Sequence, residues 1–257
     1  MVSGIESFKK WFAGYSDQYA IIGGTACNLL MSEDGLDFRA TRDIDMVLVV
    51  ESLTPEFGIR FWEYIIAGGY EHKKKNTGEP QFYRFINPKS GDFPFMIELF
   101  SRRSEAIVLP EDAVLTPLPL DDELSSLSAI LMDNDYYRFL LDGKVLIDGI
   151  SILDAGHLIP LKAKAWLDLS GRKAAGENVD SKNIRKHKND VFRLSVLLTP
   201  ETKVTVPDSV YADISEFLSA METEQVDLKQ FGIRNQTKEE VLGKIAAVYV
   251  KESSAGV

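Results

Sequence analysis

Three carboxylates lie at or within short apolar segments. Asp43 and Asp45 flank the start of an apolar, β-branched run over residues 44–50, which is typical of a buried strand. Because side chains at positions i and i+2 of a strand share a face, the two aspartates are expected to point to one spot. Two carboxylates held that close repel each other, and a hard divalent cation such as Mg²⁺ relieves the repulsion. The alternative is a strand end with exposed carboxylates.

Glu98 is the only charge in a second apolar run, residues 95–100. A lone carboxylate in such a strand is paired, exposed at the strand end, or a metal ligand. The sequence pattern by itself leaves these three alternatives open.

A glycine pair precedes the aspartates. Residues 19–22 are short and apolar, Gly23 and Gly24 follow, and a helical pattern begins at Thr25. Glycines let the backbone approach a ligand closely, and the N-terminus of a helix favours anions. The pattern therefore predicts a strand, a tight turn that cradles phosphate, and a helix, with Thr25 either adding a hydroxyl contact or capping the helix. A phosphate cradle beside a metal-binding Asp-x-Asp implies phosphoryl or nucleotidyl transfer.

The ordered set Gly23-Gly24, Asp43-x-Asp45 and Glu98 resembles the signature of nucleotidyltransferases of the DNA polymerase β superfamily. Residues 41–46, Thr-Arg-Asp-Ile-Asp-Met, resemble more narrowly the AbiEii/AbiGii-type branch of bacterial nucleotidyltransferases, some of which are toxins of toxin–antitoxin pairs. Residues 158–165 and 188–194 are similar to the lysine-bearing and aspartate-bearing helices that follow the catalytic domain in that branch.

The resemblance implies Mg²⁺ or Mn²⁺ held by three catalytic carboxylates, Asp43, Asp45 and Glu98. It also implies an NTP bound by seven residues: Gly23, Gly24, Thr25, Arg42, Lys162, Lys164 and Asp190. Lys162 fits the lysine motif better than Lys164, and Arg42 either pairs with a carboxylate or contacts phosphate. Asp190 has a plain alternative, a surface ion pair.

The implied reaction moves an NMP from an NTP to a hydroxyl of RNA (tRNA in particular), a protein or a small molecule. The alternative is a non-catalytic module that keeps the fold and binds a nucleotide or a partner. A toxin would also be expected to have an antitoxin protein as its partner.

The composition is that of an ordinary soluble protein, with 45% hydrophobic and 26% charged residues among 257. The formal net charge of −10 argues against a broad basic surface for nucleic acid, although the lysine-containing segments 73–75 and 182–188 could touch RNA. The single cysteine, Cys27, excludes an internal disulfide. With no spanning apolar run and no signal-peptide pattern, we expect a cytoplasmic protein without a membrane partner.

The chain changes from strand-rich to helix-rich near residue 153. We expect an α+β fold of the polymerase β-like nucleotidyltransferase type, with a mixed sheet flanked by helices and followed by a C-terminal helical region. The catalytic domain would cover residues 1–153 and the helical domain 154–257. Helices are predicted over about 121–132, over 154–169 with Gly171 as the end signal, and from the Thr237 capping box to about residue 250.

Overall fold

The computed structural model describes residues 3–71, 83–102 and 130–252. Most of the helix predicted over 121–132 lies outside these ranges, as does the lysine segment 73–75. The chain forms two compact units: the first comprises residues 1–119 and 144–154, and the second comprises 120–143 and 155–257. The domain limits expected from sequence remain a prediction, and this division differs from them in assigning residues 120–143 to the second unit.

The first unit is built on a six-stranded mixed sheet with the order β3-β4-β2-β1-β6-β5. Strands β1 and β6 are parallel, as are β2 and β4, and the remaining neighbours are antiparallel. The turn between β5 and β6 has positive φ at both Asp148 and Gly149, the conformation of a tight two-residue hairpin. The strands are β1 (Tyr19–Ile22), β2 (Asp43–Leu48), β3 (Tyr83–Ile86), β4 (Met96–Phe100), β5 (Lys144–Ile147) and β6 (Ile150–Leu153).

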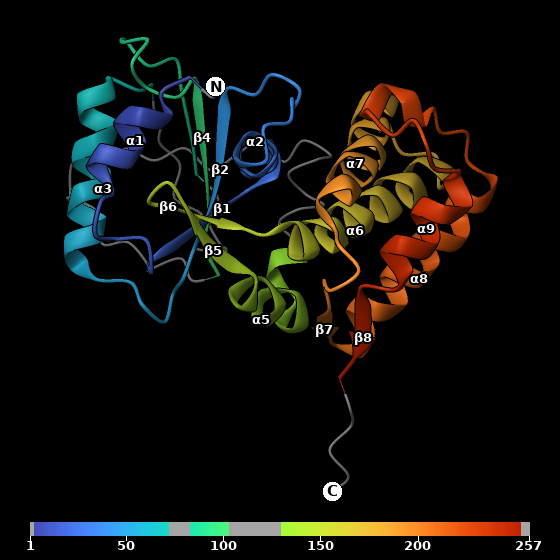
Figure 1. The fold of residues 1–257 in the computed structure, drawn as a ribbon. Coiled ribbons are helices and arrows are strands. Elements are labelled where there is room, and N and C mark those ends of the chain that lie inside the picture. The colour runs from blue at the N-terminus through green and yellow to red at the C-terminus, as the bar shows by residue number, and fades with distance from the viewer. Residues whose placement is uncertain (1–2, 72–82, 103–129, 253–257) are drawn as a thin grey trace, which may run out of the picture. The chain divides into compact units, whose positions relative to one another are not determined.

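Helices cover both faces of this sheet, with α1 (Ile5–Trp11) and α3 (Pro55–Gly68) on one side and α2 (Gly23–Glu33) on the other (Figure 1). The side of α1 and α3 is packed with aromatic rings. Tyr19 of β1 lies 5.5 Å from Phe8, and Phe85 of β3 lies 5.5 Å from Phe61, between ring centroids. Because side chains alternate along a strand, the neighbours of these residues face the α2 side.

Local signals fix the ends of α3. The Thr54 hydroxyl accepts a hydrogen bond from the Phe57 N–H, Pro55 occupies the first helical position, and Gly69 ends the helix with φ +61°. The sequence by itself predicts this helix from the Thr54 cap and Pro55 to about residue 67, with Gly68-Gly69 as its stop.

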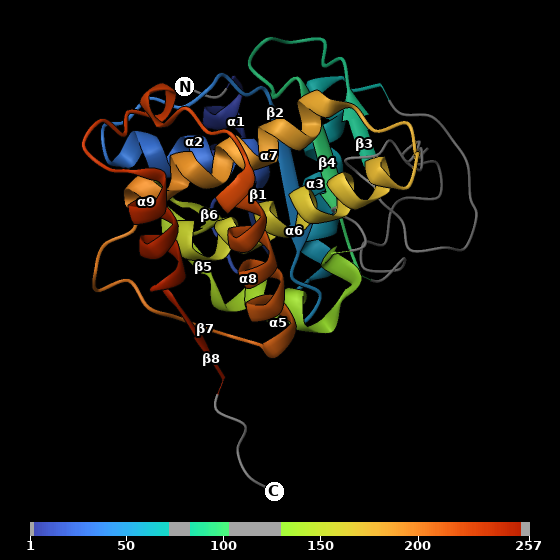
Figure 2. The same cartoon turned by 90° about the vertical axis from the view of Figure 1, so that its right-hand side faces the viewer.

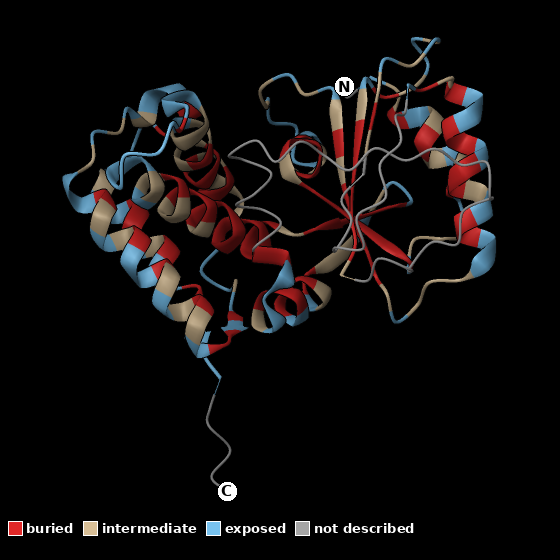
Figure 3. Ribbon diagram, turned by 180° about the vertical axis from the view of Figure 1, so that it is seen from behind, coloured by how far each residue is buried: buried red, intermediate tan, exposed pale blue. Residues whose placement is uncertain are grey.

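The second unit is helical. Its long helix α6 is largely buried and packs on α7 and α8 (Figures 2 and 3). The helices are α5 (Asn134–Asp142), α6 (Ala155–Ala174), α7 (Ser181–Leu194), α8 (Asp208–Thr223) and α9 (Lys238–Ala246), and two short parallel strands, β7 (Val204–Val206) and β8 (Tyr249–Lys251), accompany them. The predicted α+β fold class, a mixed sheet flanked by helices with a C-terminal helical region, is confirmed.

A proline inside α6 is compensated from the far end of the unit. Pro160 has no N–H, so the carbonyl of Gly156, four residues earlier, loses its helical partner. The buried Tyr249 hydroxyl donates to that carbonyl oxygen at 2.9 Å. Strand β8 thus satisfies a polar group that the sequence of α6 leaves open.

Two helix ends predicted from sequence were wrong. Helix α6 continues past Gly171 to Ala174, and Arg172 in this last turn donates to Glu177 at 2.8 Å. The final helix does begin after the Thr237 capping box, but it ends at Ala246. The chain then forms β8, because pairing with β7 satisfies its backbone.

Candidate functional site

A row of charged side chains crosses the sheet of the first unit. In register, Asp45 of β2 pairs with Glu98 of β4, and Glu98 pairs with Arg84 of β3. Residues that pair in register point to the same face, so all three lie on the α2 side of the sheet. Asp43 shares this face because it lies two residues before Asp45. The structure therefore brings the three predicted carboxylates to one face of two adjacent strands.

Gly23 makes room for the Asp45 carboxylate. It has φ +69°, and a Cβ there would lie 1.8 Å from Asp45 Oδ2. The predicted strand, glycine turn and helix are present, and α2 begins at Gly23 with no capping bond from the side chain of its N-cap residue, Ile22. The first turn of α2 thus lies directly beside the acidic row. Gly24 follows within this turn, where a Cβ would come 3.0 Å from Thr41 Oγ1.

Thr25 anchors the helix to the strand. Its side chain is fully buried and its hydroxyl donates to the Asp43 carbonyl oxygen at 2.5 Å. Because α2 begins two residues earlier, Thr25 does not act as its cap. The bond fixes the backbone at Asp43 relative to the glycine turn.

Glu98 is buried and has one positive neighbour, Arg84, and one negative neighbour, Asp45. Its Oε1 accepts from Arg84 Nε at 2.7 Å and lies 2.5 Å from a terminal guanidinium nitrogen of Arg84. Burial and the neighbouring Asp45 charge nevertheless raise the pKa of Glu98 to about 8, and the opposing effect of Arg84 is smaller. A hydrogen bond between the Glu98 and Asp45 side chains also raises the pKa of Glu98.

The donor chemistry of this pair fits a hard divalent cation. Two neighbouring carboxylates offer only oxygen ligands, and a cation bound between them would relieve their repulsion. In the described part of the chain, however, no group of three or more His, Cys, Asp or Glu side chains is arranged to hold a metal ion. The structure thus assembles Asp45 with Glu98, with Asp43 on the same face, and the metal itself stays a prediction.

The lysine and aspartate predicted from the downstream helices meet within the second unit. Lys162 of α6 lies 3.5 Å from Asp190 of α7 between Nζ and Oδ2, and both side chains are buried. Arg193 lies 3.5 Å from the other Asp190 oxygen. This buried cluster connects α6 and α7, so Asp190 is not in the surface ion pair considered as the alternative.

Lys164 and Arg42 lie elsewhere. Lys164 Nζ donates to Asp213 of α8 at 2.8 Å, so the two lysines of α6 pair with different helices. Arg42 is exposed, and its carbonyl oxygen accepts from the Phe95 N–H at 3.1 Å. Neither contact tests a role in binding nucleotide.

Two arginines of this region were missed from sequence. Arg84 pairs with Glu98, and the Arg39 guanidinium lies against the first turn of α2, where a Cβ on Gly24 would be 3.2 Å from it. Both come from segments without motif character. Only the register of β3 and the path of the loop before β2 bring them to the site.

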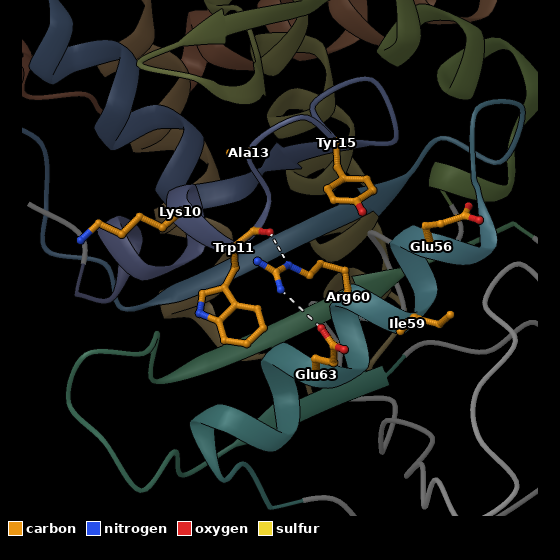
Figure 4. Close-up of a pocket in the computed structure, with 8 residues that line it drawn as sticks. All are labelled: Lys10, Trp11, Ala13, Tyr15, Glu56, Ile59, Arg60 and Glu63. Atoms are coloured by element: carbon orange, nitrogen blue, oxygen red, sulfur yellow. Dashed lines mark hydrogen bonds and ion pairs between the residues drawn. The ribbon is translucent and has the colours of Figure 1, made fainter.

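A cavity of about 380 Å³ lies on the opposite side of the same unit, between α1 and α3 (Figure 4). Arg60 spans it: Nε donates to the Trp11 carbonyl oxygen at 3.0 Å, and the guanidinium lies 4.3 Å from the Trp11 ring centroid. Arg60 thereby satisfies a carbonyl at the end of α1. The cavity is a crevice between two helices, separated from the acidic row by the sheet.

Comparisons with known proteins give a sparse result. No family model matches the chain, and no curated protein matches its sequence. Among solved structures, the chain is similar to an antigenic nucleotidyltransferase-like protein from Paracoccidioides brasiliensis, with a TM-score of 0.47, 16% identity, and coverage of 90% of this chain and 93% of that one. Within the described ranges, no helix has the length and apolar character needed to cross a membrane.

Proposed function

We propose that this protein is a nucleotidyltransferase that moves an NMP from an NTP to a hydroxyl acceptor. The acceptor oxygen loses its proton and bonds to the α-phosphorus, the bond from that phosphorus to the β-phosphate bridge breaks, and pyrophosphate leaves. The observation that carries the proposal is the in-register pair Asp45 and Glu98 beside the Gly23 turn, with Asp43 on the same face. An acidic pair next to the N-terminus of a helix combines the two features that this chemistry needs: carboxylate oxygens for a cation and backbone donors for phosphate.

The site residues of the first unit have three roles in the proposal: binding phosphate, holding the cation, and keeping these two groups in place. The backbone N–H groups at the start of α2 bind the triphosphate, because the helix N-terminus favours anions and Gly23 and Gly24 allow close approach. Asp43, Asp45 and Glu98 hold Mg²⁺ or Mn²⁺, which when bound neutralises phosphate charge and lowers the pKa of the acceptor hydroxyl. Thr25 keeps Asp43 and the glycine turn in fixed relation through its buried hydrogen bond.

From the second unit we assign Lys162 to the phosphates, with Asp190 orienting its ammonium group. Lys164 is the competing choice. The acceptor is RNA, tRNA in particular, a protein or a small molecule, and a toxin role with an antitoxin partner belongs to the same proposal. With a net charge of −10, an RNA acceptor would have to be bound at a local site.

One observation favours a second candidate, a non-catalytic module that keeps this site and binds a nucleotide or partner. Arg84 already lies against Glu98, and within the described residues no three-membered metal-binding group is formed. The two candidates differ in whether Glu98 is needed for chemistry.

The test is transfer of label from α-labelled NTPs. Protein is incubated with each NTP, Mg²⁺ or Mn²⁺, and cellular RNA, protein or small-molecule fractions. We expect Glu98→Gln to lower transfer by at least about 10²-fold with little change in nucleotide affinity, the scale lost with one electrostatic group of a catalytic site. Glu56→Gln, which changes an exposed glutamate of the same unit, is the matched control.

Nucleotide affinity tests the second unit. Lys162→Ala should weaken NTP binding by about 1–3 kcal/mol if its ammonium contacts phosphate. A loss in Lys164→Ala alone would transfer that role to Lys164. Absence of transfer with every NTP, metal and fraction favours the non-catalytic module.

A further inference from the structure

The contact between Arg84 and Glu98 is one-sided. Nε and a terminal nitrogen of the guanidinium both lie on Glu98 Oε1, at 2.7 and 2.5 Å, and neither contact involves Oε2. The Glu98 side chain is 8% exposed and that of Arg84 is 22% exposed. Two donors on one oxygen of a buried carboxylate fix the orientation of the whole group.

Arg84 reaches Glu98 because of strand register. β3 is an edge strand and pairs antiparallel with β4, and Arg84 is the residue directly opposite Glu98. On the other side of Glu98 lies Asp45, its partner in the parallel β2. Glu98 is therefore held between a guanidinium and a carboxylate along one row of the sheet.

We propose that Arg84 is a positioning residue that holds Glu98 by Oε1 so that Oε2 serves as a ligand to the divalent cation, and this inference rests on the proposed function. Carboxylates that bind a metal through one oxygen commonly accept hydrogen bonds on the other, and loss of such a partner costs 10–100-fold in metal affinity. The planar guanidinium suits this task because its donors keep a fixed geometry, whereas a lysine ammonium is a point charge.

The opposite behaviour is also physically reasonable. A positive charge beside a metal site repels the metal, so a guanidinium that merely neutralised Glu98 would compete with the cation. Removing it would then strengthen metal binding. The two roles of Arg84 therefore predict changes of opposite sign in the same measurement.

The experiment measures Mn²⁺ affinity of the full chain by calorimetry, and by the electron paramagnetic resonance signal of bound Mn²⁺. We expect Arg84→Gln to weaken Mn²⁺ binding by about 10–100-fold and to broaden the signal of the bound ion. Arg84→Lys should restore part of the affinity. Lys89→Gln, which removes one positive charge from an exposed side chain of the same unit, should leave affinity unchanged.

Asp45→Asn separates failure of this inference from failure of the proposed function. If wild type binds Mn²⁺, Asp45→Asn does not, and Arg84→Gln binds as tightly as wild type or tighter, the positioning role is overturned and the metal site stands. If wild type binds no Mn²⁺, or Asp45→Asn binds it normally, both are overturned. Should Arg84→Gln fail to fold, Arg84→Lys decides, since unchanged affinity in that variant contradicts the need for a guanidinium.

Discussion

The stability of the first unit should fall as pH rises, and Glu98 should be the cause. Burial and Asp45 raise the pKa of Glu98 from 4.5 to about 8 in the folded protein. Between these values the folded state keeps a proton that the unfolded chain has released. The stabilisation is therefore complete below pH 4.5 and is lost as pH rises through 8.

The magnitude follows from the two pKa values. They differ by about 3.5, and each pKa unit corresponds to about 1.36 kcal/mol, which gives an upper limit of about 5 kcal/mol. Because the Asp45 charge causes part of this shift, Glu98 is coupled to Asp45 and the measured change will be smaller than this limit. Glu98→Gln removes the titrating group and keeps the shape of the side chain.

The assay is urea unfolding of wild type and Glu98→Gln from pH 5 to 8 in the presence of EDTA. Both proteins carry Trp166→Phe, so that the remaining tryptophans, Trp11 and Trp62, report on the first unit alone. Carboxylates that do not contact Glu98 contribute equally to both proteins and cancel in the difference, so the difference reports on Glu98 together with Asp45. The free energy of unfolding of wild type should fall relative to Glu98→Gln as pH rises. Parallel pH profiles would refute the raised pKa.

Three further predictions concern single contacts. Gly23→Ala should destabilise the protein by about 1–3 kcal/mol and weaken Mn²⁺ binding, because the added Cβ would collide with the Asp45 carboxylate. Gly35 also has positive φ but has no atom within 4 Å of an added Cβ, so Gly35→Ala should lower stability and leave Mn²⁺ binding unchanged. Tyr249→Phe should lower the free energy of unfolding by about 1–3 kcal/mol in urea, because the Gly156 carbonyl loses its hydrogen-bond donor. The control is Tyr211→Phe, at a partly exposed tyrosine of α8. An equal loss of stability in the two variants would contradict a special role of the Tyr249 hydroxyl. Arg60→Ala should cost about 1 kcal/mol by loss of its contacts with Trp11, measured against Lys10→Ala on the same crevice.

Much of the fold could be predicted because its signals are local. The apolar runs that became β1, β2 and β4, the glycine turn before α2, and the caps at Thr54 and Thr237 each depend on a few adjacent residues. The end of α6 could not be predicted, because an exposed glycine inside a helix costs only about 1 kcal/mol and Gly171 is tolerated. β8 was missed because its pairing with β7 is non-local.

The candidate site likewise has features that the local sequence predicts and features that depend on contacts between distant segments. The common face of Asp43 and Asp45 follows from the period of a strand, and this was predictable. The register that places Glu98 beside Asp45 and Arg84 depends on three strands at once. The pairing of Lys162 with Asp190 depends likewise on how α6 packs against α7, so it could not be predicted from the sequence of either helix alone.

The two units are interleaved along the chain, and this restricts how the protein can be divided. Residues 120–143 belong to the second unit but lie between the two segments of the first. A cut after residue 154 would leave α5 on the wrong fragment, with its buried face of Tyr136, Tyr137, Phe139 and Leu140 uncovered. The other fragment would lose the contacts of α5 with α6 and α8, including the hydrogen bond from Tyr136 to Asp213. Neither unit is therefore separable by a single cut, and during synthesis the first unit cannot complete its sheet until the ribosome has already made α5 of the second.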